Sequence, residues 1–197
     1  ALERLRLKDP LFERPVDAAT FLDRRLYNDG LLVFQRGGVR HESYRNGIGP
    51  DDHHIAHSVT KTLTAMMVGI AQAEGRLDTN DPIARHVAPL ADIPAWDGVT
   101  VQHVLDMAVG IRTEEHYEDP ASMYWRYAEA VGYYGASRPP GQGGLAFVVE
   151  NLRERVAAPG SVFNYASYLT NLLPLALQSV YRRPAVDLYR EHLVARL

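Results

Sequence analysis

The sequence predicts an α/β (α+β) fold with few strands and many helices. Two observations predict it. Strand-like sequence is confined to about residues 30–57, where the apolar run 31–34 and the segment 39–44 flank a glycine pair. From residue 58 onward, apolar residues recur at intervals of three and four, the period of an amphipathic helix.

The strand-like stretch predicts a β-hairpin. Leu31 to Phe34 and Val39 to Tyr44 form its arms, and Gly37-Gly38 is expected to supply the positive φ angles of a tight turn. Residues 1–29 place apolar side chains at helical spacing, which indicates one helix before the hairpin: Phe21, Leu22, Leu26 and Tyr27. We therefore expect residues 1–57 to form an N-terminal helix and β-hairpin.

A mostly helical region is expected over residues 58–197, and both regions are expected to belong to one incomplete catalytic domain. The first helix should run from Ser58 to Glu74 and point one apolar stripe at the core: Leu63, Met66, Met67, Ile70 and Ala71. Thr100 has the side chain and position of an N-cap, for a helix ending near Gly110. Residues 111–145 are expected to be an aromatic, loop-rich stretch, and three further helices are expected: 146–156, 168–181 and 184–197.

Composition excludes several classes of protein. With 197 residues, 46% hydrophobic content and a net charge of −3, the chain can bury a core and has no basic excess for nucleic acid. No apolar run approaches the roughly 20 residues of a membrane span. The absence of Cys excludes disulfides and thiolate chemistry. The compartment stays unknown: the lack of a signal pattern weakly favours the cytoplasm, but the N-terminus, which is not Met, can have been trimmed.

Ser58 and Lys61 carry the strongest chemical signal. They stand one turn apart at the start of the first predicted helix, on the same face. A serine hydroxyl needs a neighbouring base to act as a nucleophile, and a buried lysine can be that base because burial disfavours its charged form. Lysine is also rare here: apart from Lys8 and Lys61, all of the 21 basic residues are arginine, which cannot give up its proton. The alternative is a helix cap beside a solvated charge.

Three histidines just before Ser58 raise the alternative of a metal site. His53, His54 and His57 fall in sequence that we expect to be extended, where residues four apart face one side. No carboxylate-rich partner accompanies them, so packed or solvated histidines are the better interpretation. We expect no metal and no organic cofactor.

Taken together, these motifs resemble the serine beta-lactamases, penicillin-binding proteins and related esterases. The segment 57–62 at the head of an apolar helix resembles their nucleophile motif, and Glu74 to Asp78 and Val99 to Met107 resemble their class C-like branch. Residues 115–120 resemble a segment of the 6-aminohexanoate-dimer (nylon oligomer) hydrolases. The resemblance covers about residues 30–197 and implies an antiparallel sheet flanked by helices beside a mostly helical domain.

The resemblance also implies roles for further residues. Tyr165 matches the tyrosine that hydrogen-bonds the serine and lysine and passes a proton to the leaving group. Ser167 replaces an asparagine that helps to hold the substrate, which favours esters or linear amides over lactams. Tyr117 matches a tyrosine that contacts the substrate amide nitrogen, and Tyr133 matches an aromatic residue on a loop beside the site. Packed tyrosines with satisfied hydroxyls are the alternative.

The family also has a later strand that supplies a second oxyanion N–H group, and no segment after Tyr165 fits it. We therefore expect this chain to be the N-terminal half of a longer protein, with the C-terminal sheet strands absent and that half as its partner. The expected function is a carboxylesterase or amidase with a small ester or amide substrate. A beta-lactamase or D-alanyl-D-alanine peptidase, and a non-catalytic binding descendant or inactive fragment, are the alternatives. The sequence allows a homodimer without specifying one.

Overall fold

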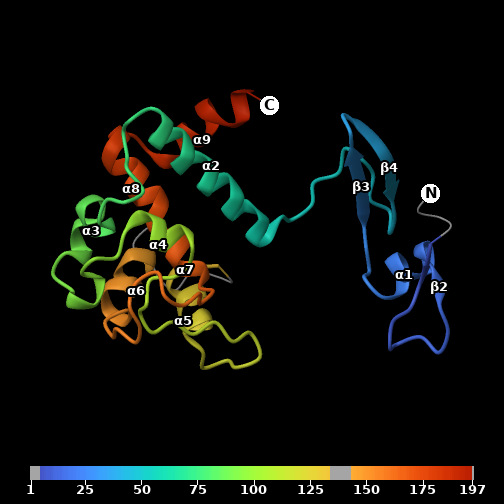
Figure 1. Ribbon diagram of the computed structural model, residues 1–197, viewed down its shortest axis with the longest axis horizontal. Coiled ribbons are helices and arrows are strands. Elements are labelled where there is room, and N and C mark those ends of the chain that lie inside the picture. The colour runs from blue at the N-terminus through green and yellow to red at the C-terminus, as the bar shows by residue number, and fades with distance from the viewer. Residues whose placement is uncertain (1–4, 134–142, 197) are drawn as a thin grey trace. The chain divides into compact units, whose positions relative to one another are not determined.

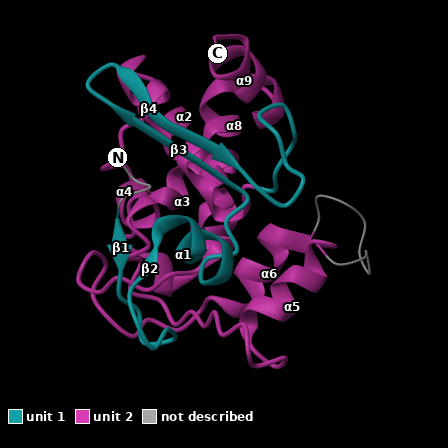
Figure 2. Ribbon diagram, turned by 90° about the vertical axis from the view of Figure 1, so that its right-hand side faces the viewer, with its two compact units in different colours: residues 1–55 teal, residues 56–197 magenta. Residues whose placement is uncertain are grey.

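The computed structural model describes residues 5–133 and 143–196. The chain divides into two compact units, Ala1–Ile55 and Ala56–Leu197, which Figure 2 shows in different colours. Each unit is described here by itself. Among the described residues, no helix is long and apolar enough to cross a membrane.

The described residues of unit 1 (residues 5–55) form two small antiparallel sheets and one helix. β1 (Arg6–Leu7) pairs with β2 (Val16–Asp17), and α1 (Ala18–Arg24) follows directly. Asp17 caps α1, because its carboxylate accepts a 2.8 Å hydrogen bond from the Thr20 N–H. The predicted helix is therefore present but ends before Leu26 and Tyr27.

The predicted hairpin is present as β3 (Gly30–Gln35) and β4 (Gly38–Tyr44). Its turn lies one residue earlier than expected. Gln35 pairs with Gly38, so the two turn residues are Arg36 and Gly37, with φ angles of 52° and 73°. A two-residue turn that matches the strand twist needs positive φ at both positions, so here Arg36 adopts that conformation and Gly38 belongs to β4.

Unit 2 (residues 56–197) is helical. Its backbone enters through a 3₁₀ turn, η2 (His57–Val59), and continues into the longest helix, α2 (Thr60–Ala73). Within this unit α2 lies against α8 and α9, as Figure 1 shows. The remaining elements are α3 (Ile83–His86), η3 (Ala88–Leu90), η4 (Pro94–Trp96), α4 (Val101–Leu105), α5 (Met123–Ala130), α6 (Gly143–Asn151), α7 (Ser167–Thr170), α8 (Leu172–Tyr181), α9 (Ala185–His192) and η5 (Val194–Arg196).

Several predicted boundaries in unit 2 need correction. Thr100 does cap α4 through a capping box with His103, but the helix ends at Leu105 rather than near Gly110. Within the stretch 111–145, predicted to be rich in loops, the structure has the helix α5, which was not predicted, and residues 134–142 lie outside the described residues. Of the stripe expected to face the core along α2, Met67 and Ala71 are buried, whereas Leu63 and Met66 remain 39% and 48% exposed.

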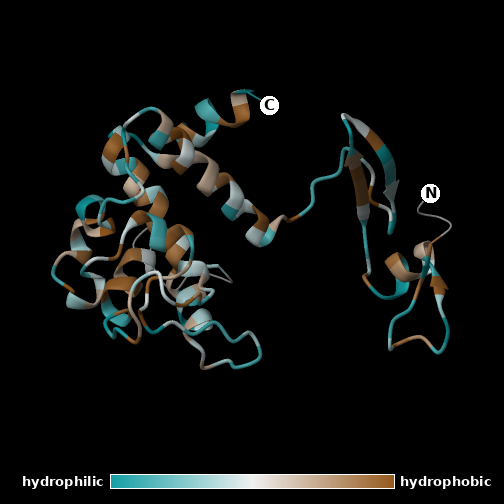
Figure 3. Ribbon diagram, viewed as in Figure 1, coloured by the Kyte–Doolittle hydropathy of each residue, from teal (hydrophilic) through white to brown (hydrophobic). Residues whose placement is uncertain are grey.

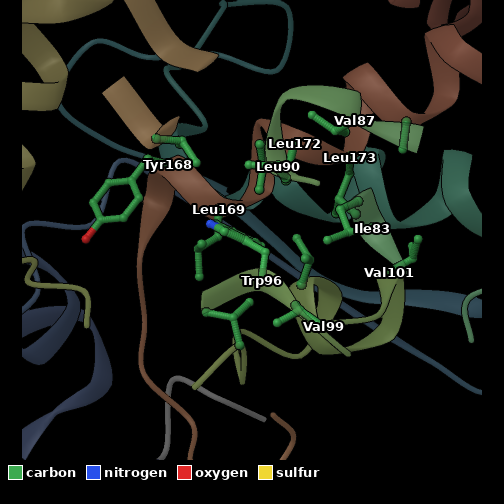
Figure 4. Close-up of a cluster of buried hydrophobic side chains, with 14 of the residues drawn as sticks. Ile83, Val87, Leu90, Trp96, Val99, Val101, Tyr168, Leu169, Leu172 and Leu173 are labelled. Carbon is green, nitrogen blue, oxygen red and sulfur yellow. The ribbon is translucent and has the colours of Figure 1, made fainter. Parts of the chain in front are cut away.

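The hydrophobic core of unit 2 includes side chains from the short helices α3, η3, η4 and α4 and from α8. Trp96 is its largest fully buried side chain, and its indole N–H donates a 3.0 Å hydrogen bond to the Leu152 carbonyl. Figure 4 shows the apolar side chains that gather around it, among them Ile83, Leu90 and Leu169. This core is the scaffold on which the candidate site is built.

Candidate active site

A cavity of about 770 Å³ opens in unit 2. Five of the six residues singled out from the sequence line it: Ser58, Lys61, Tyr117, Tyr133 and Ser167. Tyr165, the sixth, contacts Ser58 directly. The structure therefore brings together residues that are up to 109 positions apart in the printed numbering.

Ser58 and Lys61 owe their relative position to the start of the helix. Ser58 lies in η2 and Lys61 in the first turn of α2, so that their side chains leave the same face. The Lys61 Nζ donates a 2.8 Å hydrogen bond to the Ser58 Oγ. Ser58 is exposed and Lys61 half-buried. Lys61 therefore contacts Ser58 and is not an isolated surface charge.

The backbone reaches Ser58 through a bend that the sequence did not predict. Ala56 has helical dihedral angles and His57 has a φ of 42°, in the left-handed region, so residues 55–57 do not form the extended segment expected. The His57 carbonyl also accepts a 2.5 Å hydrogen bond from the Thr60 hydroxyl. Non-glycine residues rarely adopt positive φ, and when they do it is often beside a functional group.

Tyr165 completes the immediate surroundings of the Ser58 hydroxyl. Its OH donates a 2.8 Å hydrogen bond to the Ser58 Oγ, and the Lys61 Nζ lies 5.2 Å from the centre of its ring. Burial pushes the pKa of Tyr165 up, but the polar contacts with Lys61, Ser58 and Ser167 outweigh it and hold that pKa below its ordinary value. A phenol with a lowered pKa gives up its proton more readily.

Ser167 stands on the other side of Lys61. The Lys61 Nζ donates to the Ser167 Oγ at 3.3 Å, while the Ser167 hydroxyl donates to the Glu115 Oε1 at 2.8 Å. The Ser167 N–H donates to the second oxygen of the same carboxylate. Sequence reasoning placed Ser167 in the site but did not single out Glu115. The one signal for Glu115 was its place in the segment 115–120, which carried the family resemblance.

Hydrogen bonds between two segments that are far apart in the chain hold Glu115 and Ser167 in place. The Asn164 side-chain amide donates to the Thr113 carbonyl at 3.0 Å and to its hydroxyl at 2.7 Å. The Glu114 N–H donates to the hydroxyl of the buried Tyr168 at 3.0 Å. Thr113 and Glu114 immediately precede Glu115, and Asn164 and Tyr168 lie on either side of Ser167 in the chain. The position of Glu115 is therefore fixed by its neighbours as well as by its own contacts.

Tyr117 stands at the cavity wall, 56% exposed. Its OH donates a 2.5 Å hydrogen bond to the Glu115 Oε1, and its ring makes an edge contact with Tyr124 at 4.9 Å. The hydrogen bond to Glu115, together with partial burial and the carboxylate charge, raises the pKa of Tyr117, so its proton is firmly held. Tyr133 lies at the same wall, 58% exposed.

Two of the histidines before Ser58 belong to different units. His54 belongs to unit 1, where its Nε2 lies 3.0 Å from the Asp29 carboxylate, and His57 lines the cavity of unit 2. In the part of the chain that the structure describes, no group of three His, Cys, Asp or Glu residues is placed to hold a metal ion.

Comparison with known proteins defines the class. The model of the family described as Beta-lactamase matches residues 24–197, and the chain belongs to that family. The resemblance and the fold expected from the sequence are thereby confirmed.

Particular relatives are hydrolases by name. The chain is 34% identical to the 6-aminohexanoate-dimer hydrolase of Paenarthrobacter ureafaciens over 170 residues, which are 86% of this chain and 42% of that protein. A candidate 6-aminohexanoate-dimer hydrolase structure from Bacillus anthracis matches 94% of this chain and 48% of its own, with a TM-score of 0.72 and 21% identity. A D-stereospecific amidohydrolase from Streptomyces sp. matches 79% and 45%, with a TM-score of 0.58 and 25% identity. The chain thus spans under half the length of these relatives.

Proposed function

We propose that the protein carrying this chain is a serine hydrolase that forms an acyl-enzyme at Ser58 on a short ester or linear amide. One observation carries the proposal: the Ser58 Oγ accepts 2.8 Å hydrogen bonds from both the Lys61 Nζ and the Tyr165 OH, beside a cavity of about 770 Å³. A cap or a relic would not require two ionisable groups on one hydroxyl.

The first half-reaction follows from these contacts. Lys61, in its uncharged form, takes the Ser58 proton as the Ser58 Oγ attacks the substrate carbonyl carbon. The developing oxyanion meets the Ser58 N–H, which lies in the first turn of a helix where N–H groups have no partner within the helix. A second donor is expected from the strand that the family carries later in its sequence.

Tyr165 donates a proton to the leaving group. When the carbonyl carbon separates from its alcohol or amine, that group needs a proton, and the Tyr165 hydroxyl lies within hydrogen-bond reach of Ser58 to supply it. The lowered pKa of Tyr165 suits this transfer. Lys61 then passes the proton it took from Ser58 to Tyr165, which restores both groups. Water next attacks the acyl carbon and gives a proton to Lys61. The bond to the Ser58 Oγ breaks, the acid is released, and Ser58 regains its proton from Lys61.

Hydrolysis of p-nitrophenyl acetate by the protein at its natural length tests the proposal. Ser58→Ala removes the nucleophile, and we expect the rate to fall by about 10³-fold or more. Ser179→Ala, on the exposed side of α8, is the matched control and should leave the rate unchanged. Equal rates for wild type and Ser58→Ala would end the proposal. Faster acylation by penicillin than by the ester would replace an esterase or amidase with a lactam-directed enzyme.

A further inference from the structure

A second, smaller cavity of about 190 Å³ lies in unit 2 beside the cavity that Ser58 lines. The two cavities share three lining residues, Tyr127, Val131 and Asn171. The other residues around the smaller cavity belong to α6, α7 and α8, and Figure 1 shows α6 next to α5, which carries Tyr127. A substrate held at Ser58 therefore has a second space directly behind one wall of its own cavity.

The smaller cavity is lined by uncharged and mostly apolar groups. None of its described lining residues carries a charge, and its apolar side chains include Leu145 and Val148 from α6 and Leu172 and Leu175 from α8. The larger cavity, by contrast, presents Lys61 and several hydroxyl groups. Apolar surface gains free energy when it leaves water, whereas a charged group would lose its hydration here without a partner. The smaller cavity therefore suits the apolar end of a ligand.

One hydrogen bond forms part of the wall between the two cavities. The Asn171 side-chain amide donates to the Tyr127 OH, and both residues line both cavities. The Tyr127 ring is buried and packs against Phe147 and Tyr168, each with ring centres 5.4 Å away, so its position is fixed. Asn171 is exposed, so its side chain can rotate away from Tyr127 without disturbing the core. That rotation would join the two cavities.

Gly144 keeps the smaller cavity open. It is the second residue of α6, and a Cβ there would lie 3.5 Å from the Tyr127 hydroxyl oxygen and 3.5 Å from the Val131 side chain. These are ordinary van der Waals contacts, so no clash requires glycine at this position. A helical glycine lowers stability relative to alanine. A side chain longer than a methyl group would extend into the cavity, so glycine preserves that space.

We propose that the smaller cavity receives the apolar end of a linear acyl chain attached to Ser58, so that Tyr127, Asn171 and Gly144 set the preferred chain length. This inference rests on the proposed acyl-enzyme at Ser58 and specifies its acyl group. No further bond forms or breaks at the smaller cavity, because the chain end is held by burial alone. The protein should then prefer octanoyl to butyryl groups, since each buried methylene group strengthens binding several-fold.

Chain-length profiles with p-nitrophenyl esters test the inference. We would measure kcat/KM for the butyrate and the octanoate in the protein at its natural length, and we expect wild type to favour the octanoate by about tenfold or more. Gly144→Leu fills the cavity, so it should reduce activity toward the octanoate about tenfold more than toward the butyrate. Glu150→Leu places the same side chain on the exposed side of α6 and should change neither activity.

Leu175→Ala enlarges the same cavity from α8 and tests the opposite direction. It should raise the activity toward the decanoate relative to the octanoate by several-fold, because the longer chain gains room. A substitution that only disturbed the fold would lower the activity toward all chain lengths in equal proportion. Opposite shifts of the profile in Gly144→Leu and Leu175→Ala therefore distinguish a chain-binding cavity from a packing defect. Melting temperatures of both variants would show that they remain folded.

Labelling of Ser58 by a fluorophosphonate keeps the two proposals distinguishable. If wild type is not labelled at Ser58, the proposed function fails and the inference falls with it. If wild type is labelled but Gly144→Leu leaves the chain-length profile unchanged, or lowers it equally at every length, only the inference is overturned. A labelled wild-type protein that prefers the butyrate to the octanoate would overturn it as well.

Discussion

The two units of the molecule bury their side chains very differently. Among the described residues of unit 1, Ala18 is the one buried hydrophobic side chain, whereas unit 2 buries a continuous set centred on Trp96. Figure 3 shows β3 as hydrophobic over much of its length, and Leu32 and Phe34 in it are 55% and 64% exposed. A two-stranded hairpin is at best marginally stable without packing. Unit 2 therefore carries both the core and the proposed chemistry.

The two lysines give the largest expected contrast, because Lys61 lies in unit 2 and Lys8 in unit 1. Lys61→Arg replaces a side chain that can lose its proton with one that cannot, so we expect ester hydrolysis to fall by roughly 10²–10⁴-fold. Lys8→Arg should leave the rate unchanged. Initial rates with p-nitrophenyl acetate measure both. Comparable activity of Lys61→Arg and wild type would mean that Lys61 is not the base.

Core substitutions should show the same contrast in stability. Trp96→Ala removes the largest fully buried side chain of unit 2 and a hydrogen bond to Leu152, and we expect it to lower the free energy of unfolding by about 3–5 kcal/mol. Phe34→Ala, in the exposed face of β3, should change it by under about 0.5 kcal/mol. Urea unfolding of this chain measures both. Equal losses would show that the hairpin is packed as tightly as the core.

Substitution of two glycines with positive φ distinguishes the cost of backbone strain from the cost of a steric clash. Gly110 and Gly37 have φ angles of +70° and +73°, but a Cβ on Gly110 would lie 2.3 Å from the Ala157 carbonyl oxygen, whereas one on Gly37 has nothing within 4 Å. Gly37→Ala should therefore cost only the left-handed conformation, about 1–2 kcal/mol. Gly110→Ala must also displace backbone, so its loss should be clearly larger. Thermal unfolding of the two variants, run side by side, gives the order directly, and the reverse order would contradict the packing described.

The smallest expected effect is a pH dependence in unit 1. The hydrogen bond to Asp29 raises the pKa of His54, and hydrogen bonds from Asn46 and His54 lower the pKa of Asp29. The contribution of His54 to stability is thus fully present below its unfolded pKa of about 6.5 and lost as pH rises through its higher folded pKa. The contribution of Asp29 to stability is present above its unfolded pKa of about 3.8, and it is lost as pH falls through its lower folded pKa.

An NMR titration of the His54 ring checks this sign. We expect an inflection above 6.5 in wild type and a return toward 6.5 in Asp29→Asn. An inflection at or below 6.5 in wild type would mean that the pair does not form in solution.

Local sequence predicted the elements whose signals are local. The hairpin, α2 and the cap of α4 depend on glycine, on apolar period and on Thr100, all of which can be seen in a short window. α5 was missed because Tyr124, Trp125 and Tyr127 are weak helix formers, and its buried side chains, Tyr127, Ala128 and Ala130, are stabilised by packing against other elements.

The residues of the candidate site also differ in whether a local sequence signal could identify them. Ser58 and Lys61 lie within one helical turn, and the family resemblance brought Tyr165 to them. Glu115 lies in the segment 115–120 that carried the resemblance, but nothing in the sequence singled it out, because its place in the site depends on contacts with Ser167, 52 residues away. The bend at His57 was likewise not predicted, since positive φ is uncommon in any non-glycine residue, even though histidine adopts it more often than most.

Trapping the acyl-enzyme is the most direct test of the central proposal, that Ser58 is a nucleophile activated by Lys61 and Tyr165. The protein at its natural length would be mixed with p-nitrophenyl butyrate, quenched in acid within the first turnovers, and digested for mass spectrometry. We predict a butyryl mass increase on the peptide that contains Ser58, which is absent in Ser58→Ala and strongly reduced in Lys61→Arg. Turnover of the ester with Ser58 unmodified, or an equal mass increase in Ser58→Ala, would contradict it.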